Sequence, residues 1–559
     1  MDNSAIAESF SLLSKLMDIH GENSFRSKNY SIAAYNIDNL NIQLKDADPS
    51  SIAQIKGIGE SIGTKIRELI DTGELSLLNE YIMRTPPGVI EMLQIKGIGP
   101  KKIHTIWKEM EIESVGELLY ACNENRLTRF KGFGEKTQQN VQEAIEFFLL
   151  NQGSFLYAQL EELFPQVDGY LKKLFSPDKV HVTGAYRRQD LTIDELEFVV
   201  LASNDTVKPK FQTAQPPELL EESPVMLLYR LKNGLKLKLH TGSSHMGSAL
   251  FRTTGPEQFL QQFRLQFPSV SMDQTDNEAD IFSRAGMEII PPPLRGCEEM
   301  LPLALTNELP ALIEPADIKG IIHTHSTWSD GEHSIEEMAA NCIKQGFEYL
   351  VISDHSRAAA YAKGLSIERI REQQFEIDQL NARLQPFRIF KSIECDILND
   401  GSLDYPDEIL ATFDLVIASV HSNLKMSEEK AMQRVMTAIA NPYTTILGHP
   451  TGRLLLSRRG YPLDHTALID ACAANKVVIE LNAHPRRLDI DWRYIQYAIQ
   501  KNVLLSIDPD AHSADAFGDT RYGVLAAQKG GLTKSGNLSS MSLQEFEAFL
   551  QQRRFEKGI

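Results

Sequence analysis

The chain has 559 residues, which at roughly 150 residues per domain is enough for three or four domains. Hydrophobic residues make up 42% and charged residues 24%, a balance that excludes fibrous and wholly disordered chains. No apolar run approaches the roughly 18 residues of a membrane span, and the first residues carry no secretory signal pattern. Five isolated cysteines argue against a disulfide framework, so a cytoplasmic protein is expected.

The net charge of −18 argues against a protein that coats nucleic acid through a broad basic surface. It leaves open local binding of phosphate groups, through backbone amides or through metal ions.

Residues 1–150 have apolar residues at helical spacing and contain one short pattern three times, at 55–66, 95–106 and 130–141. Each copy reads apolar-Lys-Gly-apolar-Gly and leads into a helix. Glycines allow a tight turn, and the helix N-terminus and the lysine attract a phosphate without reading sequence. One copy alone is typical of an ordinary helix–helix turn, but three copies favour DNA binding. The predicted DNA-binding residues are Lys56, Gly57, Gly59, Lys96, Gly97, Gly99, Lys131, Gly132 and Gly134.

Residues 151–300 change character and read as an α/β domain with an appended helical part. Strand-like runs occur at 180–186, 196–203 and 234–240. The segment 289–310 holds three consecutive prolines and little periodicity, which makes it the best linker candidate.

Residues 317–559 alternate short apolar strands with helices, a pattern that predicts an α/β barrel, closed or distorted. Several strand-like runs end on a turn that bears a histidine. Because such folds place ligands at the C-terminal ends of their strands, we expect these side chains to meet there.

The side chains at these strand ends are imidazoles and carboxylates, which together suit Zn²⁺, Mn²⁺ or Fe²⁺ better than Ca²⁺ or Mg²⁺ alone. The set exceeds what one tetrahedral metal uses, so two or three ions are expected. Such a cluster activates water and stabilises charge on phosphate, which is the chemistry of phosphoester hydrolysis. The predicted ligands are His323, His325, Asp330, His355, Glu394, His421, His449, Asp510 and His512.

Each of five residues near the predicted ligands has two alternative roles. Asp354 orients His355 or joins the metals, and His333 is a surface residue or supports a ligand. For His484, Arg486 and Arg453, contact with a substrate phosphate and a purely structural role both remain open.

The order of these segments carries a resemblance. The opening HGENSFRSKNYSIAAYNI (20–37), the hairpin repeats, the GAYRR segment (184–188) and the histidine-rich C-terminal domain resemble bacterial family X DNA polymerases with a C-terminal PHP domain. The resemblance covers essentially the whole chain.

The resemblance implies a multidomain α and α/β fold. Its parts are N-terminal helix-hairpin-helix domains, a family X polymerase-like (nucleotidyltransferase) palm and thumb, and a C-terminal PHP barrel of distorted (β/α)7 type. The implied domains are a lyase-like helical DNA-binding domain with the first hairpin (1–85), a fingers-like helix-hairpin-helix domain (86–150), a palm-like domain (151–240), a thumb-like region (241–290), a linker (291–316) and the PHP metal-dependent phosphoesterase domain (317–559).

The same resemblance locates a polymerase site that has diverged. Family X enzymes hold two metal ions with three carboxylates, but here Glu195 and Glu197 replace two aspartates. The longer side chains would displace ions that demand near-octahedral geometry, and Lys236 and Lys238 lie on the strand where a third aspartate is expected. Arg187 and Arg188 match the family pattern and either contact phosphate or are strand-end charges.

Three further residues follow from the resemblance. Arg252 and Thr253 replace the aromatic pair that gates the sugar. Lys65 matches the Schiff-base lysine of animal members, where an amine attacks an open abasic sugar, although a surface lysine or a phosphate contact is the simpler interpretation.

The implied function is DNA repair on gapped, nicked or abasic DNA, without sequence specificity and without a membrane. The PHP domain would act as a 3′→5′ exonuclease, with abasic endonuclease or 3′-phosphatase activity also open, and polymerase activity would be weak or lost. Alternatives are an active gap-filling polymerase that takes dNTPs and uses Glu195 and Glu197 with Mg²⁺ or Mn²⁺, a non-catalytic DNA-end scaffold, and a phosphatase of small esters. The sequence leaves the oligomeric state open.

Overall fold

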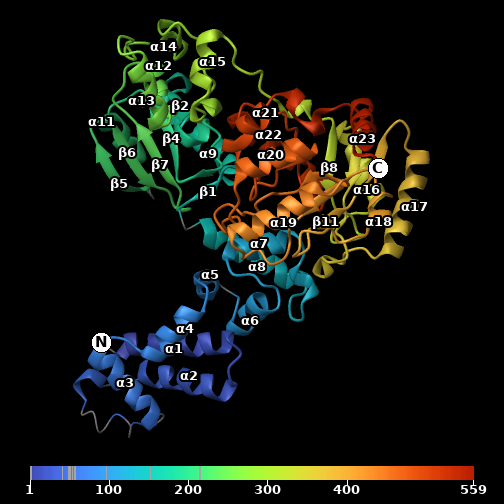
Figure 1. Cartoon of the computed structure of the whole chain (residues 1–559). Helices are drawn as coiled ribbons and strands as arrows, with labels where there is room; N and C mark the ends of the chain where they lie inside the picture. Colours follow the sequence, from blue (N-terminus) through green and yellow to red (C-terminus); the bar gives the residue numbers. More distant parts are fainter. Residues whose placement is uncertain are drawn as a thin grey trace. The chain divides into compact units, whose positions relative to one another are not determined.

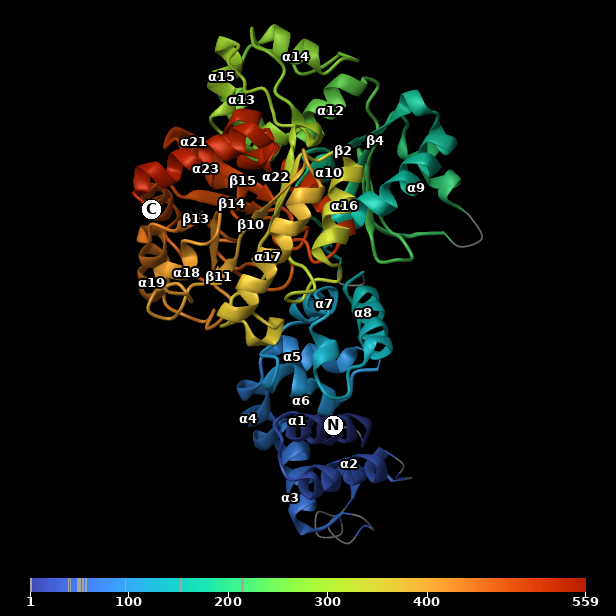
Figure 2. The same cartoon turned by 90° about the vertical axis from the view of Figure 1, so that its right-hand side faces the viewer.

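The computed structural model describes residues 3–38, 40, 42–47, 52, 55, 58–95, 97–150, 153–212 and 216–559. The chain divides into two compact units, Met1–Phe148 and Leu149–Ile559 (Figures 1 and 2). Among the described residues, no helix combines the length and the apolar character that crossing a membrane requires.

The first unit is helical. Its first two helices pack together through apolar faces, and the Phe10 and Tyr30 rings stack with centroids 5.8 Å apart. Helix ends follow local signals: Gly73 ends one helix in the left-handed conformation, and Ser114 begins another with a capping box. The helices are α1 (Asn3–Ile19), α2 (Ser24–Asp38), α3 (Glu60–Thr72), α4 (Ser76–Arg84), α5 (Pro87–Glu91), α6 (Pro100–Lys108), α7 (Val115–Asn123) and α8 (Glu135–Leu150).

The three predicted hairpins share one backbone geometry. In each, an amide donates to the carbonyl three residues earlier, and a helix begins directly after the last glycine of the repeat. The apolar residue between the glycines is buried in every copy. The three closing bonds run from Ile58 N to Ile55 O (2.9 Å), Ile98 N to Ile95 O (3.3 Å) and Phe133 N to Phe130 O (3.1 Å).

The second unit begins with a palm-like sheet whose strand order is β2-β4-β7-β6-β5. Strand β4 runs parallel to β7 and antiparallel to β2, and α9 (Tyr157–Phe175) packs on the sheet through a shared apolar core. The predicted strand at 180–186 ends early, because GAYR forms the short helix α10 (Gly184–Arg187). The strands are β2 (Val180–Thr183), β4 (Glu195–Val200), β5 (Glu218–Ser223), β6 (Met226–Arg230) and β7 (Lys236–His240).

A helical thumb-like layer follows the sheet. Its core contains a cluster of phenylalanines and extends to Leu294, Met300 and Ala304, so the segment predicted as a linker is partly folded onto this layer. The domain bounds themselves remain predictions. The helices here are α12 (Met246–Thr254), α13 (Glu257–Gln266), α14 (Ala279–Arg284), η7 (Pro292–Gly296) and α15 (Met300–Thr306).

The C-terminal part is a ring of short parallel strands surrounded by helices (Figure 2). Two sheets, β10-β9-β8 and β11-β12-β13-β14-β15, are joined by bridges between Thr324 and Ala511 and between His355 and Glu394. Strand β11 begins almost where β10 ends, so the two form one interrupted strand and the ring is a distorted barrel. The strands are β8 (Gly320–Thr324), β9 (Tyr349–Ile352), β10 (Arg388–Lys391), β11 (Glu394–Asp396), β12 (Val416–Ser419), β13 (Thr444–Leu447), β14 (Val478–Asn482) and β15 (Leu505–Asp508).

The barrel helices pack against the strands through buried apolar residues. Capping boxes begin the first and last of them, which explains why Ser334 and Ser542 set their N-termini. The main helices are α16 (Ile335–Gln345), α17 (Ile367–Arg383), α19 (Glu428–Ala440), α20 (His465–Asn475), α22 (Thr520–Lys529) and α23 (Leu543–Lys557).

The barrel and the palm-like domain meet through charged groups of α22. The ammonium of Lys529, with a side chain only 2% exposed, lies 2.7 Å from a carboxylate oxygen of Asp190. It also donates to the backbone carbonyl of Arg188 at 2.9 Å. At the other end of the helix, Arg521 pairs with Glu161 of α9. These contacts fix the palm-like domain against the barrel.

Candidate metal centre and palm-like site

The nine predicted ligands converge at the C-terminal end of the barrel strands. Each side chain is at most 9% exposed, although several are separated by more than 100 residues in sequence. Every ligand comes from a strand end or from the loop that follows, which is where a parallel barrel gathers side chains.

Three of the ligands have a backbone conformation that L-residues adopt rarely. The φ angles of His323, His449 and Asp510 are +61°, +21° and +54°. His323 also lies in β8 where the strand register shifts, and a bulge re-aims a side chain. Strained residues persist where the surrounding structure determines them, and they cluster at functional sites.

Glu394, the first residue of β11, is the centre of the cluster. One of its oxygens lies 2.9 Å from His449 Nε2, 3.0 Å from His421 Nε2 and 3.3 Å from His323 Nε2. The other lies 2.9 Å from His355 Nδ1. A carboxylate surrounded in this way can bridge two metal ions.

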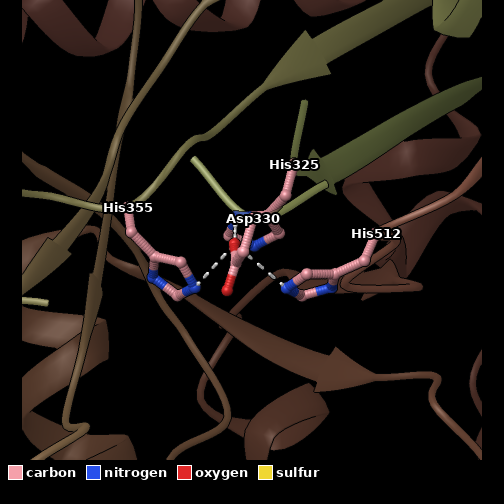
Figure 3. Close-up of side chains that lie close together, drawn as sticks. All are labelled: His325, Asp330, His355 and His512. Atoms are coloured by element: carbon pink, nitrogen blue, oxygen red, sulfur yellow. Dashed lines mark ion pairs between the residues drawn. The ribbon is translucent and has the colours of Figure 1, made fainter. Parts of the chain in front are cut away.

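Asp330 occupies the middle of a second group, shown in Figure 3. One of its oxygens lies 3.5 Å from His512 Nε2, 3.6 Å from His355 Nε2 and 3.9 Å from His325 Nδ1. The loop that carries Asp330 is held by Asp354, which accepts hydrogen bonds from Ser326 and Ser329. Asp354 therefore supports the loop, since none of the metal-holding groups found among the described residues includes it.

Three groups of side chains have ligand atoms within 4.8 Å of one another. They share His325 and His355, so they form one continuous cluster. The number of bound ions stays a prediction. The groups are His325, Asp330, His355 and His512; His323, His325 and Asp510; and His355, Glu394 and His421.

Unsatisfied polar atoms in this cluster indicate that it is built for a cation. His323 Nε2, His325 Nδ1 and Glu394 Oε2 are buried and make no hydrogen bond. Buried polar atoms without partners are costly in folded proteins, so a ligand atom in this state fits a bound metal. The residues present therefore fit a divalent metal centre.

Charge at the cluster supports the same conclusion. Burial and the nearby imidazoles of His512 and His355 lower the pKa of His325 to about 3, which keeps this ring neutral and able to bind a metal. Burial acts to raise the pKa of Glu394, but the surrounding histidines hold it well below its ordinary value, so the carboxylate is ionised. In turn the carboxylates raise the pKa of His323 against the effect of burial. Ionised carboxylates beside imidazoles are the ligand set that a divalent cation requires.

Sequence reasoning missed two acids beside the ligands. Asp396 lies 3.3 Å from His421 Nδ1, and Glu480 contacts His323 Nδ1. Asp396 stands two residues after Glu394, so strand alternation would have placed both on one face. Glu480 is a single acidic residue inside the apolar run VVIELN, which is itself an unusual position for a charge.

The residues with two alternative roles have the following partners in the structure. Arg453 pairs with Asp491 and donates to backbone carbonyls of residues 487 and 488, so its guanidinium has structural partners. His484 accepts from the Arg486 amide at 3.2 Å, and burial lowers the pKa of His484 to about 3. Arg487, which sequence reasoning did not name, lies 3.7 Å from the second oxygen of Asp510. The His333 carbonyl accepts from Thr327, in the loop before Asp330.

The palm-like site differs from the metal centre because basic side chains already hold its carboxylates. Lys238 Nζ lies 2.9 Å from Glu195, and His240 Nε2 lies 2.8 Å from Glu197. Burial alone would raise the pKa of Glu197, but its hydrogen bond with His240 and the nearby charges lower it overall. No metal-holding group among the described residues includes either glutamate. The Lys238 partner follows from the sequence, whereas the His240 partner does not.

The two arginines of the GAYRR segment also have protein partners. Arg187 donates to Glu278 at 2.7 Å, and Arg188 donates to Asp190 at 2.6 Å. At the sugar-gate positions, Arg252 pairs with Asp273 on the surface, and the Thr253 hydroxyl lies 2.6 Å from that of Thr183. These groups are therefore engaged with partners within the fold.

The predicted DNA-binding residues are described only in part, since Lys56, Gly57 and Lys96 lie outside the described residues. Gly97 and Gly132 have φ angles of +92° and +95°, the conformation that glycine tolerates best. A Cβ built on any of the described hairpin glycines would meet no atom within 4 Å, so packing within the chain does not require them; these are Gly59, Gly97, Gly99, Gly132 and Gly134.

Two of the lysines singled out from the sequence, Lys131 and Lys65, are among the described residues. Lys131 is exposed beside the third turn, and Lys65 is half-buried on α3. Glycines open to solvent, next to a helix N-terminus and an exposed lysine, leave room for another backbone to approach.

Comparisons with known proteins agree with this architecture. Three family models match the chain: a helix-hairpin-helix domain over residues 1–75, a SAM-like helix-hairpin-helix tandem over 89–146 and a PHP domain over 322–484. The DNA polymerase/3′-5′ exonuclease PolX of Bacillus subtilis is 32% identical over 557 residues, which cover 96% of this chain and 97% of the relative.

Shorter relatives match the barrel. A probable phosphatase of Acetivibrio thermocellus is 31% identical over 171 residues, 29% of this chain and 64% of the relative. A probable phosphatase of Thermoanaerobacter sp. (strain X514) is 25% identical over 247 residues, 42% of this chain and 96% of the relative.

The fold and the cluster of histidines and carboxylates define a PHP-domain protein with N-terminal helix-hairpin-helix domains. The similarity along the whole chain goes further. The chain belongs to the PolX family, the bacterial family X DNA polymerases that carry a C-terminal PHP domain.

Proposed function

We propose that the chain is a cytoplasmic DNA repair enzyme whose working active site is the metal cluster of the PHP barrel. It hydrolyses phosphodiester bonds at 3′ ends, as a 3′→5′ exonuclease, on gapped, nicked or abasic DNA. The name of the Bacillus subtilis relative, which joins polymerase and 3′-5′ exonuclease, supports DNA as the substrate, and the names of the shorter relatives support phosphoester hydrolysis in the barrel.

The contrast between the two sets of carboxylates carries the proposal. In the barrel, Glu394 and Asp330 are surrounded by imidazole nitrogens, several of them without hydrogen bonds. In the palm-like sheet, Glu195 pairs with the ammonium of Lys238, and Glu197 is hydrogen-bonded to His240. A cation would complete the first site, but it would have to displace an existing protein partner of each carboxylate from the second.

The residues that would hold the metals are the nine ligands of the barrel. Bound divalent ions supply Lewis-acid activation of water and of a phosphoryl oxygen. Mixed imidazole and carboxylate ligands favour Mn²⁺ or Zn²⁺, with Fe²⁺ as the third choice. The side chains contribute preorganisation, because burial and hydrogen bonds fix the ligands before any substrate arrives.

The hairpins supply binding that is independent of sequence. Their exposed glycines and helix N-termini suit a DNA backbone, which an acidic chain otherwise attracts poorly. They would hold the duplex or the gap while a 3′ end reaches the barrel. The lyase role of Lys65 stays a prediction, since the structure adds only that Lys65 is half-buried on α3.

The test is primer processing by the full-length protein. A 5′-labelled primer in a one-nucleotide-gapped duplex is incubated with Mn²⁺, with and without dNTPs. The wild type and the Glu195→Ala, Glu197→Ala double variant should shorten the primer equally, and a His323→Ala, His325→Ala double variant should not. Shortening that survives the histidine substitutions would refute the assignment.

The same assay distinguishes the alternatives. Extension with dNTPs that is lost with Glu195 and Glu197 would establish an active gap-filling polymerase with Mg²⁺ or Mn²⁺ at the palm. Normal binding of gapped DNA without turnover in any metal would establish a scaffold. Cleavage at abasic sites, or release of 3′-phosphate, would define a broader substrate range for the same barrel site.

A further inference from the structure

Glu480 lies inside the barrel rather than at a strand end. It is the middle residue of β14, and its side chain is fully buried. Both of its carboxylate oxygens are used: one contacts His323 Nδ1, and the other accepts the backbone amide of His449 at 2.5 Å. One side chain therefore joins two of the predicted ligands, which come from β8 and from the end of β13.

Both contacts require Glu480 to accept a hydrogen bond, one at each carboxylate oxygen. The backbone amide of His449 can only donate. His323 presents Nε2 to the other ligands, 3.3 Å from Glu394 and 3.4 Å from Asp510, and this nitrogen makes no hydrogen bond. A ring that binds metal through Nε2 carries its proton on Nδ1, so it donates to Glu480.

The same two partners have strained backbones. His323 and His449 have φ angles of +61° and +21°, conformations that must be held by their surroundings. Glu480 contacts both of these residues, at the ring of one and at the backbone of the other. The Glu480 carboxylate thus contacts two ligands whose backbone conformations are unfavourable for L-residues.

We propose that Glu480 is a positioning residue of the metal centre. It fixes the Nδ1-protonated tautomer and ring orientation of His323, and it holds the turn that presents His449. It does not bind the metal. This inference rests on the proposed metal-dependent function and adds a residue outside the predicted ligand set.

Replacement by glutamine tests the proposal with little change of volume. An amide has one acceptor oxygen, so it can satisfy either His323 or His449 but presents NH₂ to the other donor. We expect Glu480→Gln to weaken Mn²⁺ binding about 10- to 100-fold, the usual effect of losing a partner of a metal ligand. Mn²⁺ per full-length chain is measured after dialysis against a series of free Mn²⁺ concentrations.

A matched control is Asp508→Asn. Asp508 is equally buried, on the neighbouring strand β15, but its oxygen accepts from Ser506 at 2.6 Å, which asparagine preserves. Mn²⁺ affinity within about twofold of wild type is expected for this variant. A loss as large as that of Glu480→Gln would mean that any buried acid suffices, and the proposal would fall.

A double-mutant cycle separates positioning from general stability. If Glu480 acts through His323, then Glu480→Gln adds little further loss of Mn²⁺ affinity in a His323→Ala background, apart from the His449 contact. Fully additive losses would overturn the proposal. A wild-type chain that binds no Mn²⁺ would instead defeat the proposed function itself.

The wild-type protein provides a test that needs no Glu480 variant to fold. Long-range proton–nitrogen spectra of the Zn²⁺-loaded, histidine-labelled chain report ring tautomers, and the His323 signal is identified by its loss in His323→Ala. Protonation at Nδ1 is expected. Protonation at Nε2 would contradict the assigned geometry.

Discussion

At the residue scale, the carboxylates of the two sites differ in their partners. The buried Glu394 is surrounded by imidazoles that can share a metal with it, whereas the partly exposed Glu195 faces an ammonium and Glu197 is hydrogen-bonded to a histidine. The difference lies in the partner rather than in the acid. A carboxylate paired with a fixed cation stabilises the sheet, but it offers little to a divalent ion.

Glu278, a buried carboxylate paired with two arginines, shows how strongly such pairs hold the thumb-like layer. Its oxygens accept from Arg187 at 2.7 Å and from Arg295 at 2.5 Å, and the side chain of Arg295 is fully buried. Because Glu278→Gln would leave a buried guanidinium without its counter-charge, we expect a loss of about 3 kcal/mol in the free energy of unfolding. Glu257→Gln, in an exposed pair with Arg264, should change it by less than about 0.5 kcal/mol.

The pH dependence of the Glu278 ion pairs follows from the direction in which the pKa of Glu278 is shifted. Burial would raise the pKa of Glu278, but Arg295 and Arg187 lower it overall. Its stabilising contribution is therefore complete above the unfolded pKa of about 4.5 and is lost as the pH falls below that value. Thermal unfolding between pH 7 and pH 3 should show a steeper loss for wild type than for Glu278→Gln. Parallel curves would refute this role.

At the scale of elements, short sequence patterns predict those turns, helix starts and strand ends that depend on local interactions. The glycine turns, the helices after them and the strand ends with their histidines all follow from local patterns. The hairpins recur with one hydrogen bond each because the repeat fixes turn and helix start together. The linker prediction was less informative, because Leu294 and Met300 find their partners in a distant helical layer.

The second hairpin allows a test that separates DNA binding from stability. Gly99 is the N-cap of α6 with φ of −92°, and a Cβ there would meet no atom within 4 Å. Threonine caps a helix about as well as glycine, so Gly99→Thr should leave the unfolding temperature unchanged. We expect affinity for gapped DNA to fall about tenfold in a fluorescence anisotropy titration, because the new side chain blocks backbone approach.

Two other glycines serve as controls for this experiment. Gly97→Thr should also destabilise the hairpin, since Gly97 has a φ of +92°. Gly169→Ala, on an open position of α9, should leave DNA binding as in wild type. Unchanged affinity in Gly99→Thr would show that DNA does not use this turn.

At the scale of the whole molecule, long-range contacts decide what the sequence could not predict. Lys529 meets Asp190 across more than 300 residues, and Glu480 of β14 reaches His323 of β8, which lies 157 residues earlier in the chain. Neither pair forms a local pattern. The nine ligands were predictable because each lies in or near a short apolar strand, whereas Glu480 contacts His323 only because the ring of strands closes.

The contact of Lys529 predicts how firmly the palm-like domain is fixed to the barrel. Asp190→Asn leaves a buried ammonium without its counter-charge, so we expect a loss of about 3 kcal/mol and faster proteolysis between the two domains. The double variant Asp190→Asn, Lys529→Met should recover the part of this loss that comes from the unpaired Lys529 ammonium, while Arg188 lacks the acid partner in both variants. Limited proteolysis and thermal unfolding report the two effects. Equal damage in the single and double variants would rule out the ion pair as the cause.

The central claim is that the barrel holds the metals and the palm-like sheet does not. The direct measurement is the number of Mn²⁺ ions per full-length chain, by elemental analysis after dialysis at fixed free Mn²⁺. The account predicts two or three ions in wild type and in the Glu195→Ala, Glu197→Ala variant, and fewer than one in a His325→Ala, His355→Ala variant, which damages all three ligand groups. Ions lost with Glu195 and Glu197 but retained without the histidines would contradict it.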